Sequence, residues 1–194
     1  RLDSGALPEA QIVDIAPVIS RVVRMLRLVA EEKQVELSYE IRREGQTLAS
    51  EDELNEIIYN LTENAIKYNR PGGFVRVALS GDKETCLLTV SDNGIGMDKD
   101  EMENNLGTIC KSGSLQFKKD MEKQEDIDII GQFGVGFYSA FMVADTVTVI
   151  SKKYGSEEAW KWTSSGADGY TMEPAEREGA GTDVIMTLKA DAED

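Results

Sequence analysis

Asp92 and the glycines that follow it form a stretch of the sequence suited to bind a ligand. Ser91–Met97 (SDNGIGM) places a carboxylate before two glycines at alternate positions, Gly94 and Gly96. Because glycine has no Cβ, the backbone there can approach a flat ligand closely, and the carboxylate supplies a strong hydrogen-bond acceptor. The same pattern occurs in ordinary turns, so this stretch alone leaves open both a turn and a ligand site.

A second group of polar side chains lies on the helix predicted after the capping box Ser50–Glu53 (SEDE), where Ser50 accepts from the Glu53 N–H and Glu53 reaches back. Asn60, Asn64 and Lys67 stand at positions i, i+4 and i+7 and share one side of that helix. Such a polar stripe is usually only solvated. Two amides and an ammonium group in line with the downstream Asp92 motif also suit a ligand site.

A glycine-rich stretch, Gly131–Phe137 (GQFGVGF), precedes a predicted helix that continues through Met142. Three glycines at a helix start expose backbone N–H groups to a phosphate, and the helix dipole adds roughly 0.3–1 kcal/mol to anion binding. A Rossmann site also uses spaced glycines, but it needs a preceding strand and a downstream acidic partner in a βαβ unit, which this sequence lacks. The pattern therefore favours a phosphate site of another kind.

The composition excludes several kinds of chemistry. The 194 residues contain no histidine, which removes His-based acid–base catalysis, Ser-His and Cys-His nucleophiles and the commonest zinc ligand. A formal net charge of −15 argues against nucleic acid as a partner, so an anionic ligand needs a local pocket of N–H groups, a metal ion or both. Cys86 and Cys110 lie far apart, and two reduced thiols are favoured over a disulfide or a metal site.

The length and the apolar pattern predict one soluble domain. A chain of 194 residues can bury roughly 70% of its unfolded surface without disulfides. No apolar run approaches about 18 residues, and no charged-then-apolar leader is present. We therefore expect no membrane span, no signal peptide and a cytoplasmic location.

The N-terminal half predicts two helices and three strands. Residues 1–11 are expected to be a tail, and a helix begins at Asp14, which caps it, with Pro17 in the first turn. A half-buried strand follows at 35–41, and residues 74–80 and 85–91 form a hairpin. The core residues expected from helical spacing are Ile15, Val18, Ile19, Val22, Leu26 and Val29 in the first helix and Leu54, Ile57, Ile58 and Leu61 in the second.

The C-terminal half predicts a helix capped by Asp98 with Glu101, then strands at 146–151, 159–163, 170–172 and 182–188. Trp160 and Trp162 fall on one side of their strand, which is typical of core packing. The charged segment Lys118–Asp128 has little to bury and is expected to be a mobile lid. Helices combined with hairpins, without regular βαβ alternation, predict an α+β layered sandwich.

Longer motifs give the sequence a resemblance to two known families. Residues 1–91 resemble the catalytic ATP-binding domain of bacterial sensor histidine kinases, through Arg1–Gly5 (RLDSG) and Asn60–Tyr68 (NLTENAIKY). Residues 92–190 resemble the N-terminal nucleotide-binding domain of the bacterial ninety-kilodalton heat-shock chaperone. The matching stretches there are Asp92–Met97, Asn104–Gly113 (NNLGTICKSG), Gly131–Phe137 and Gly181-Thr182.

Both families belong to the GHKL superfamily, so the resemblance implies the Bergerat ATP-binding fold, a two-layer sandwich of helices on a mixed, mostly antiparallel sheet. It implies a single domain at 12–190, kinase-like over 12–91 and chaperone-like over 92–190, with a lid at about 98–130. Residues 1–91 carry 11 basic and 15 acidic residues (net −4), and residues 92–194 carry 10 and 21 (net −11). From the change of motifs and of charge we infer an engineered chimera joined at the shared Asp92 motif.

The resemblance also implies a binding role for each matching residue. Asp92 would accept a hydrogen bond from the adenine amino group, Thr182 would support it through water, and Tyr68 would pack beside the base. Asn64 would be the protein ligand of Mg²⁺, an ion that takes oxygen ligands. The implied contacts to phosphates or ribose are Lys67, Asn105 and Lys111. The other implied site residues are Gly94, Gly96, Met97 and Gly131, with Gly134, Val135, Gly136 and Phe137 offering N–H groups to phosphates. The expected ligands are ATP or ADP with Mg²⁺.

Neither parental reaction is complete in this sequence. The chaperone family has a catalytic Glu one helical turn before the magnesium-binding Asn, where this chain has Asn60. An amide orients water but cannot accept its proton at neutral pH, and neither Glu56 nor Glu63 is expected to replace the base. Histidine kinase activity needs a phosphoacceptor His, so it is expected only in trans, with a separate His-containing domain. We expect nucleotide binding with slow or absent ATP hydrolysis; a non-catalytic interaction module is the remaining alternative.

Overall fold

The structure is a computed structural model that describes residues 10–112, 140–166 and 169–189, and of residues 107–112 the backbone alone. Its helices are α1 (Ile15–Lys33), α2 (Glu51–Lys67) and α3 (Lys99–Ser112), and residues 140–143 are also helical. Its strands are β1 (Gln11–Asp14), β2 (Glu36–Ile41), β3 (Gln46–Ala49), β4 (Phe74–Gly81), β5 (Cys86–Asp92), β6 (Ala144–Lys152), β7 (Ala159–Ser164), β8 (Tyr170–Ala175) and β9 (Gly181–Leu188). No helix in these ranges is both long and apolar enough to cross a membrane.

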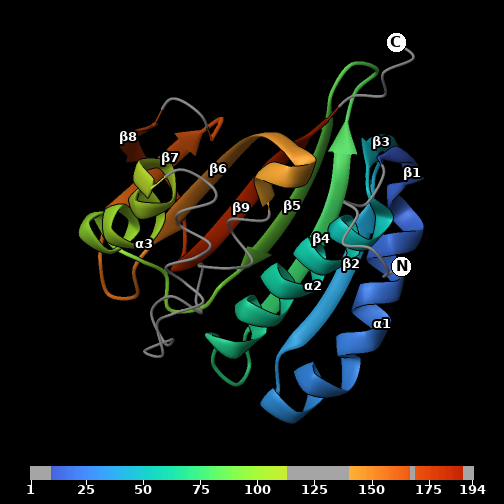
Figure 1. Ribbon diagram of the computed structural model, residues 1–194. Helices are drawn as coiled ribbons and strands as arrows, with labels where there is room; N and C mark the ends of the chain where they lie inside the picture. Colours follow the sequence, from blue (N-terminus) through green and yellow to red (C-terminus); the bar gives the residue numbers. More distant parts are fainter. Residues whose placement is uncertain (1–9, 113–139, 167–168, 190–194) are drawn as a thin grey trace.

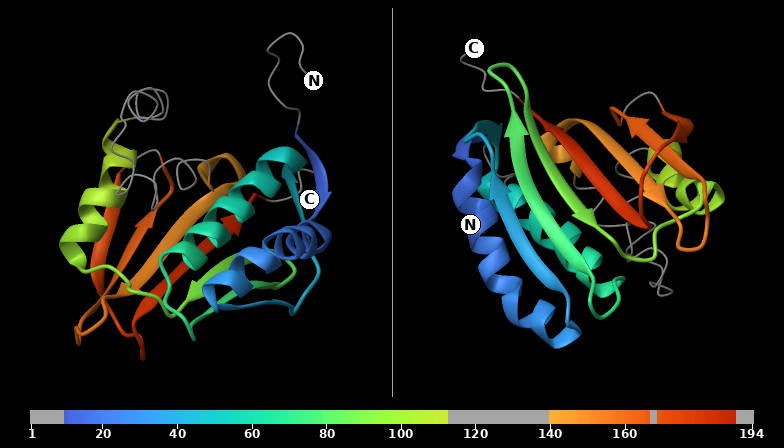
Figure 2. Two further views of the ribbon diagram at one scale, coloured as in Figure 1. Left: turned by 90° about the horizontal axis from the view of Figure 1, so that it is seen from below. Right: turned by 180° about the vertical axis from the view of Figure 1, so that it is seen from behind.

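One seven-stranded sheet forms the framework, in the order β2-β4-β5-β9-β6-β7-β8. Strands β2 and β4 run parallel, and every other neighbouring pair is antiparallel. Helices α1, α2 and α3 lie on one face of this sheet (Figures 1 and 2), and β1 pairs with β3 in a separate two-stranded sheet. The α+β, two-layer fold expected from the sequence is therefore confirmed.

The core lies between that face of the sheet and helices α1 and α2. Val29 was expected on the buried side of α1, but it is 39% exposed, and Ala30 is buried instead. The buried side of the helix shifts toward Val23 in the middle of α1 and toward Ala30 in its last turns, so the spacing of the first turns does not extend to Val29. The other residues expected in the core of α1 and α2 are buried: Ile15, Val18, Ile19, Val22, Leu26, Leu54, Ile57, Ile58 and Leu61.

Helices α2 and α3 begin with the capping residues that the sequence predicts. The Ser50 Oγ accepts a hydrogen bond from the backbone N–H of Glu53 at 3.3 Å. The Asp98 N–H donates to the Glu101 carboxylate at 3.0 Å, and the Glu101 N–H donates to the Asp98 carboxylate at 2.9 Å. These bonds satisfy backbone donors that have no partner within the helix, and they fix the residues at which the two helices begin.

The N-terminal strand β1 differs from the sequence expectation in two ways. Gln11, expected in a tail over residues 1–11, begins β1, which pairs with β3. Asp14 precedes α1, but its side chain makes no cap hydrogen bond and accepts from the Gln46 Nε2 at 2.8 Å. The carboxylate points that way because Asp14 is also the last residue of β1, directly opposite Gln46 in β3.

Aromatic residues pack on the helix-bearing face of the C-terminal strands, as the sequence predicts. Trp162 is fully buried, and its ring stacks on Tyr170 with 5.9 Å between the ring centroids. Trp160 lies on the same side of β7, where the Lys99 Nζ lies 5.0 Å from its ring centroid and links the start of α3 to the sheet.

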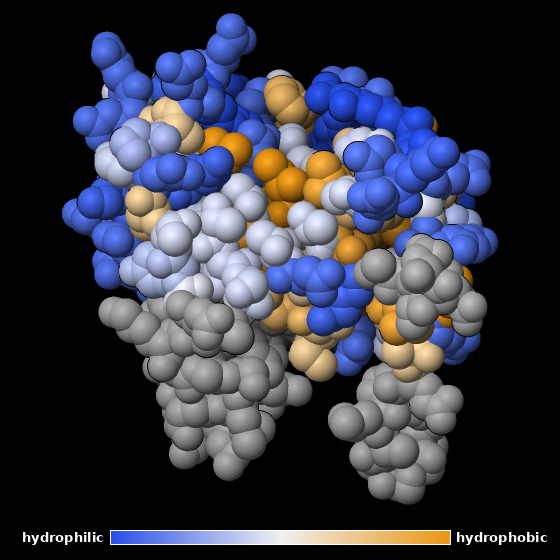
Figure 3. Space-filling model, turned by 90° about the horizontal axis from the view of Figure 1, so that it is seen from above, coloured by the Kyte–Doolittle hydropathy of each residue, from blue (hydrophilic) through white to orange (hydrophobic). Residues whose placement is uncertain are grey.

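Much of the surface seen in Figure 3 is hydrophilic, with apolar residues gathered in a band across its middle.

Strand β5 carries Asp92 into the middle of the sheet. Val75 in β4 lies opposite Asp92 on one side, and Thr182 in β9 lies opposite it on the other. The end of β5 is therefore the point where the N-terminal and C-terminal halves of the chain meet, close to the end of α2.

Candidate functional site

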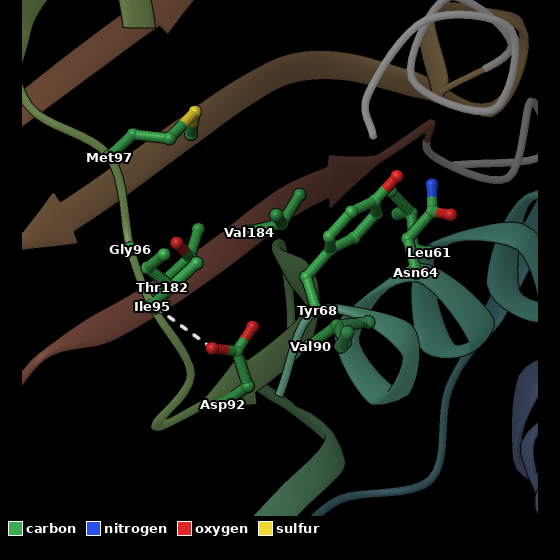
Figure 4. A pocket seen from close by; sticks show the side chains of 11 residues that line it. Leu61, Asn64, Tyr68, Val90, Asp92, Ile95, Gly96, Met97, Thr182 and Val184 are labelled. Carbon is green, nitrogen blue, oxygen red and sulfur yellow. Dashed lines mark hydrogen bonds between the residues drawn. The ribbon is translucent and has the colours of Figure 1, made fainter. Parts of the chain in front are cut away.

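A pocket opens between α2, the ends of β5 and β9, and the turn at 94–97 (Figure 4). The space between its walls measures about 470 Å³, including the part open to solvent. The polar side chains at its wall are Asn64, Tyr68, Asp92 and Thr182, and the other lining residues are Leu61, Ala65, Val90, Ile95, Gly96, Met97 and Val184. Such a wall suits a flat, largely apolar ring that carries a few polar atoms.

Asp92 holds one carboxylate oxygen in a fixed position and directs the other into the pocket. Its Oδ1 accepts hydrogen bonds from the N–H of Gly94 at 2.8 Å and from the N–H of Thr182 at 3.3 Å. Figure 4 shows the bond to Thr182 and shows the second oxygen, Oδ2, directed toward the interior of the pocket. The backbone of two neighbouring segments thus orients an acceptor toward any ligand that enters.

The surroundings of Asp92 also shift its ionisation. Burial, which disfavours the charged carboxylate, raises the pKa of Asp92 to about 6. The N–H of Gly94, the positive charge of Arg177 and the N–H of Thr182 oppose that rise, and the nearby carboxylate of Asp183 adds to it. The surface that Asp92 retains lines the pocket. At neutral pH the group is mainly ionised, so that Oδ2 is an acceptor.

Thr182 contributes through its backbone and through a buried pair of hydroxyl groups. Its Oγ1 lies 2.8 Å from the Ser151 Oγ, which also accepts from the Met97 N–H at 2.8 Å and donates to the Gly181 carbonyl at 3.2 Å. Ser151 has one proton to donate, so all three bonds are satisfied when Thr182 donates to Ser151. The Thr182 oxygen then keeps acceptor capacity at the pocket wall. The sequence gives no signal for Ser151, because a serine in a strand is ordinary.

The two glycines of the Asp92 motif are required by the protein backbone itself. A Cβ at Gly94 would lie 2.8 Å from the Tyr68 carbonyl oxygen, and Gly96 has φ +70°, with a Cβ there colliding with the carbonyl of Lys152. Glycine therefore lets the turn at 94–97 pack closely against the end of α2 and against β6. The sequence explained these glycines by the approach of a ligand, but the structure gives them a second role in shaping the pocket wall.

The polar stripe on α2 only partly reaches the pocket. Asn64 lines it, and the Tyr68 ring projects into it from the end of the helix. Lys67 is exposed, with its Nζ 5.3 Å from the centroid of the Tyr68 ring, so its charge stands beside the opening. Asn60 is half-buried one turn earlier and is not among the lining residues.

Of the remaining expected site residues, two are placed by the structure and the others lie where it describes no side chains. Met97 is buried at the pocket wall, and the Asn105 Nδ2 lies 3.8 Å from its Sδ, so Asn105 stands behind the lining layer. Lys111 lies in α3, where only the backbone is described. Residues 113–130 of the expected lid lie outside the described residues, as do Gly131, Gly134, Val135, Gly136 and Phe137.

Val90, Ile95 and Val184 contribute apolar walls to the pocket that were not expected from the sequence. A signal for Val184 existed, because it alternates with Thr182 along β9 and so faces the same side of the sheet. Ile95 is 51% exposed and belongs to the turn, where side-chain direction does not follow from periodicity.

Comparison with known families assigns the chain to one group of proteins. Residues 49–192 match the family HATPase_c, described as histidine kinase-, DNA gyrase B-, and HSP90-like ATPases. The match includes α2, Asp92 and Thr182. The chain belongs to this family.

Bacterial chaperones are among the relatives of this ATPase domain. The chain is 57% identical over 146 residues to the chaperone protein HtpG of Bacillus subtilis (strain 168) and 56% identical over the same length to that of Clostridium botulinum (strain 657 / Type Ba4). Each match covers 75% of this chain and 23% of the relative, so the chain spans about a quarter of the length of these curated relatives. A match of 146 residues within 194 includes residues 49–146 wherever it begins, so the similarity extends to both sides of Asp92.

Solved structures of histidine kinases share the fold of the whole domain. The mycobacterial sensor histidine kinase MprB superposes with a TM-score of 0.57 at 16% identity, covering 94% of this chain and 99% of that one. The catalytic domain of histidine kinase ThkA gives a TM-score of 0.59 at 12% identity, covering 95% and 98%. Both resemblances inferred from the sequence are confirmed, the one to the kinases as a likeness of fold.

Proposed function

We propose that the chain binds ATP or ADP in this pocket, with the adenine ring against Asp92. The observation that carries the proposal is the Asp92 carboxylate, whose Oδ1 is held by two backbone N–H groups while Oδ2 faces a pocket with apolar walls. The exocyclic amino group of adenine is a donor that fits this acceptor, and the apolar side chains suit the faces of the ring. Membership of an ATPase family supports the same ligand.

The phosphate end of the nucleotide is proposed to lie toward the polar side of α2. Asn64 lines the pocket there, and Lys67 places a positive charge beside its opening. Asn105, Lys111 and the N–H groups at 134–137 complete the proposed phosphate and ribose contacts on the strength of the resemblance. This arrangement would concentrate donors and positive charge locally in a chain of formal net charge −15.

Magnesium belongs to the proposal through Asn64. No cluster of three or more His, Cys, Asp or Glu side chains suited to a metal occurs in the described part of the chain, so the protein would supply few ligands. An amide oxygen fits Mg²⁺, which often keeps several waters and takes further oxygens from nucleotide phosphates. When bound, the ion would neutralise phosphate charge.

We propose that turnover is slow or absent. By the resemblance to the chaperone family, Asn60 would stand at the position of the general base, and its amide can orient a water molecule without taking its proton. Asn60 also stays outside the residues that line the pocket. The domain is therefore proposed to act mainly by binding and releasing nucleotide.

A chimeric origin is part of the same proposal. Kinase-like motifs end before Asp92, and chaperone-like motifs begin there. The 146-residue match to HtpG also includes residues 49–91, on the kinase-like side. The two halves would join inside one sheet, since β5 pairs with β4 of the first half and with β9 of the second. A cytoplasmic location, as expected from the sequence, is proposed with it.

Calorimetric titration with ADP and Mg²⁺ tests the proposal in the wild-type protein and in Asp92→Asn. Asparagine keeps an oxygen for the N–H groups of Gly94 and Thr182, but it places an NH₂ group where the adenine amino group needs an acceptor. We expect the affinity to fall at least about 100-fold, because two donors would face each other in a buried site. Asp145→Asn is the matched control, since Asp145 is an exposed carboxylate whose ion-pair partner is Lys189 at 3.7 Å. Equal ADP affinity in wild type and Asp92→Asn would overturn the assignment.

A further inference from the structure

Arg177, in the connection between β8 and β9, binds the main chain of Asp92. Its Nη2 donates to the Asp92 carbonyl oxygen at 2.7 Å and to the Asp183 Oδ1 at 3.2 Å, and its Nε donates to the Asp183 Oδ2 at 3.1 Å. Its Nη1 donates to the Gly179 carbonyl at 2.6 Å. The side chain is only 14% exposed. A planar guanidinium suits such a set of acceptors because its donors form a rigid fork.

The connection that carries Arg177 is itself anchored. The Lys152 Nζ, at the end of β6, donates to the carbonyls of Arg177 and Glu178, both at 3.2 Å. Gly181, with φ +131°, lies so close to the Asp92 carbonyl that a Cβ there would collide with it. The segment from Arg177 to Gly181 is therefore packed against the end of β5 as a unit, and Asp92 has little freedom to shift along it.

We propose that Arg177 is the positioning residue of Asp92, fixing its main chain through the carbonyl oxygen so that Oδ2 meets the adenine amino group. Three contacts then define the carboxylate: Arg177 holds the backbone, and the N–H groups of Gly94 and Thr182 hold Oδ1. This inference rests on the proposed nucleotide binding. It adds a residue that touches no ligand and comes from a loop distant in sequence.

The charges near Asp92 give this role a signature that a merely structural ion pair would lack. Arg177 and Asp183 are the charged groups that act on Asp92 from β9 and the loop before it. Tyr68 is the titratable group that α2 contributes to the pocket, and among the described lining residues Asp92 carries the only charge. The charge of Arg177 lowers the pKa of Asp92 and that of Asp183 raises it, so removing each should move the titration in opposite directions.

The test uses Arg177→Ala, Arg177→Lys and Asp183→Asn, with Arg24→Ala as control, because Arg24 is an exposed arginine on α1 that does not line the pocket. The Asp92 carboxyl is titrated by carbon NMR in protein without nucleotide, and ADP affinity is measured by calorimetry at pH 7. Circular dichroism identifies the variants that fold. If Arg177→Ala does not fold, Arg177→Lys and Asp183→Asn provide the test.

We expect Arg177→Ala to raise the Asp92 midpoint by about one pH unit and to weaken ADP binding about tenfold. Arg177→Lys should leave the midpoint near wild type yet weaken binding, because it keeps the charge and loses the fork. Asp183→Asn should lower the midpoint. A folded Arg177→Ala protein with the wild-type midpoint and ADP affinity would overturn the inference. If the wild type itself fails to bind ADP, the proposed function falls, while the NMR titration still decides whether Arg177 acts on Asp92.

Discussion

Thr182 and Asp92 are cross-strand neighbours on β9 and β5, and the Thr182 N–H donates to the Asp92 Oδ1 at 3.3 Å. This bond joins residues 90 positions apart in the sequence, so the orientation of the carboxylate depends on correct pairing of the two halves of the chain. The ligand site and the register of the sheet are therefore one structural feature. Any change that shifts β9 against β5 should weaken nucleotide binding before it affects the rest of the fold.

Asp92→Asn should remove a pH dependence from protein stability. The pKa of Asp92 is about 6 in the folded protein, against about 3.9 for an unperturbed aspartate, so the folded state binds the proton more tightly than the unfolded state. The free energy of unfolding should fall as pH rises from about 4 to about 6 and stay lower above that, by roughly 3 kcal/mol at most. The variant should accordingly be more stable than wild type at pH 8. Urea unfolding at pH 5 and pH 8 measures this, and an identical loss in both proteins would contradict it.

Adenosine binding should weaken as the solution is acidified through pH 6. The ionised Asp92 carboxylate accepts from the adenine amino group, and protonation at Oδ2 would oppose that bond. Affinity should drop up to about tenfold per pH unit below the pKa of about 6. Adenosine is the probe because it carries no phosphate that titrates in this range. An affinity constant between pH 7.5 and pH 5 would show that the carboxylate of Asp92 does not contact the base.

Asn60→Glu should raise ATP hydrolysis if this position on α2 serves the reacting water. A positioned general base contributes roughly 10²–10⁴-fold, so we expect an increase of at least about 10²-fold in the steady-state rate with ADP affinity unchanged. Asn60→Gln is the control, because it has the length of glutamate without the base. An unchanged rate in a nucleotide-binding Asn60→Glu protein would remove Asn60 from the catalytic position.

Gly96→Ala and Gly155→Ala form a matched pair that separates backbone strain from steric collision. Both glycines have positive φ, +70° and +87°, but a Cβ at Gly155 meets nothing within 4 Å, whereas one at Gly96 collides with the Lys152 carbonyl. Gly155→Ala should cost about 1 kcal/mol of unfolding free energy, and Gly96→Ala at least about 2 kcal/mol more. Urea unfolding compares them, and equal losses would mean that the turn at 94–97 is free to move away from β6.

The elements best predicted from the sequence are those with strong periodicity and local caps. Helix α2 has an unbroken apolar side and a Ser50–Glu53 cap, and the β4–β5 hairpin has alternating residues around a short turn, so local physics specifies both. Strands β1 and β3 are four residues long, too short for alternation to stand out. Asp14 has the residue type and position of a helix cap, so the sequence predicts one. Its actual partner, Gln46, becomes a neighbour only when β1 and β3 pair.

The site residues that could be predicted from the sequence are those that lie in recognisable motifs. Those whose role depends on contacts made only in the folded protein could not be predicted. Asp92, Asn64 and Tyr68 fall in recognisable motifs and do line one pocket. Arg177 stands in a charged loop that resembles a solvated connection, and its contact with Asp92 exists only in three dimensions. Ser151 is a buried hydroxyl whose partners come from two separate segments, Met97 in the turn and Gly181 and Thr182 at the start of β9.

A crystal structure of the protein with ADP and Mg²⁺ tests the central claim most directly. We expect the adenine ring between α2 and the turn at 94–97, with its exocyclic nitrogen within hydrogen-bonding distance of the Asp92 Oδ2 and the carbonyl of Asp92 still bound by Arg177. An adenine ring bound outside this pocket, or turned so that its amino group faces away from Asp92, would contradict it.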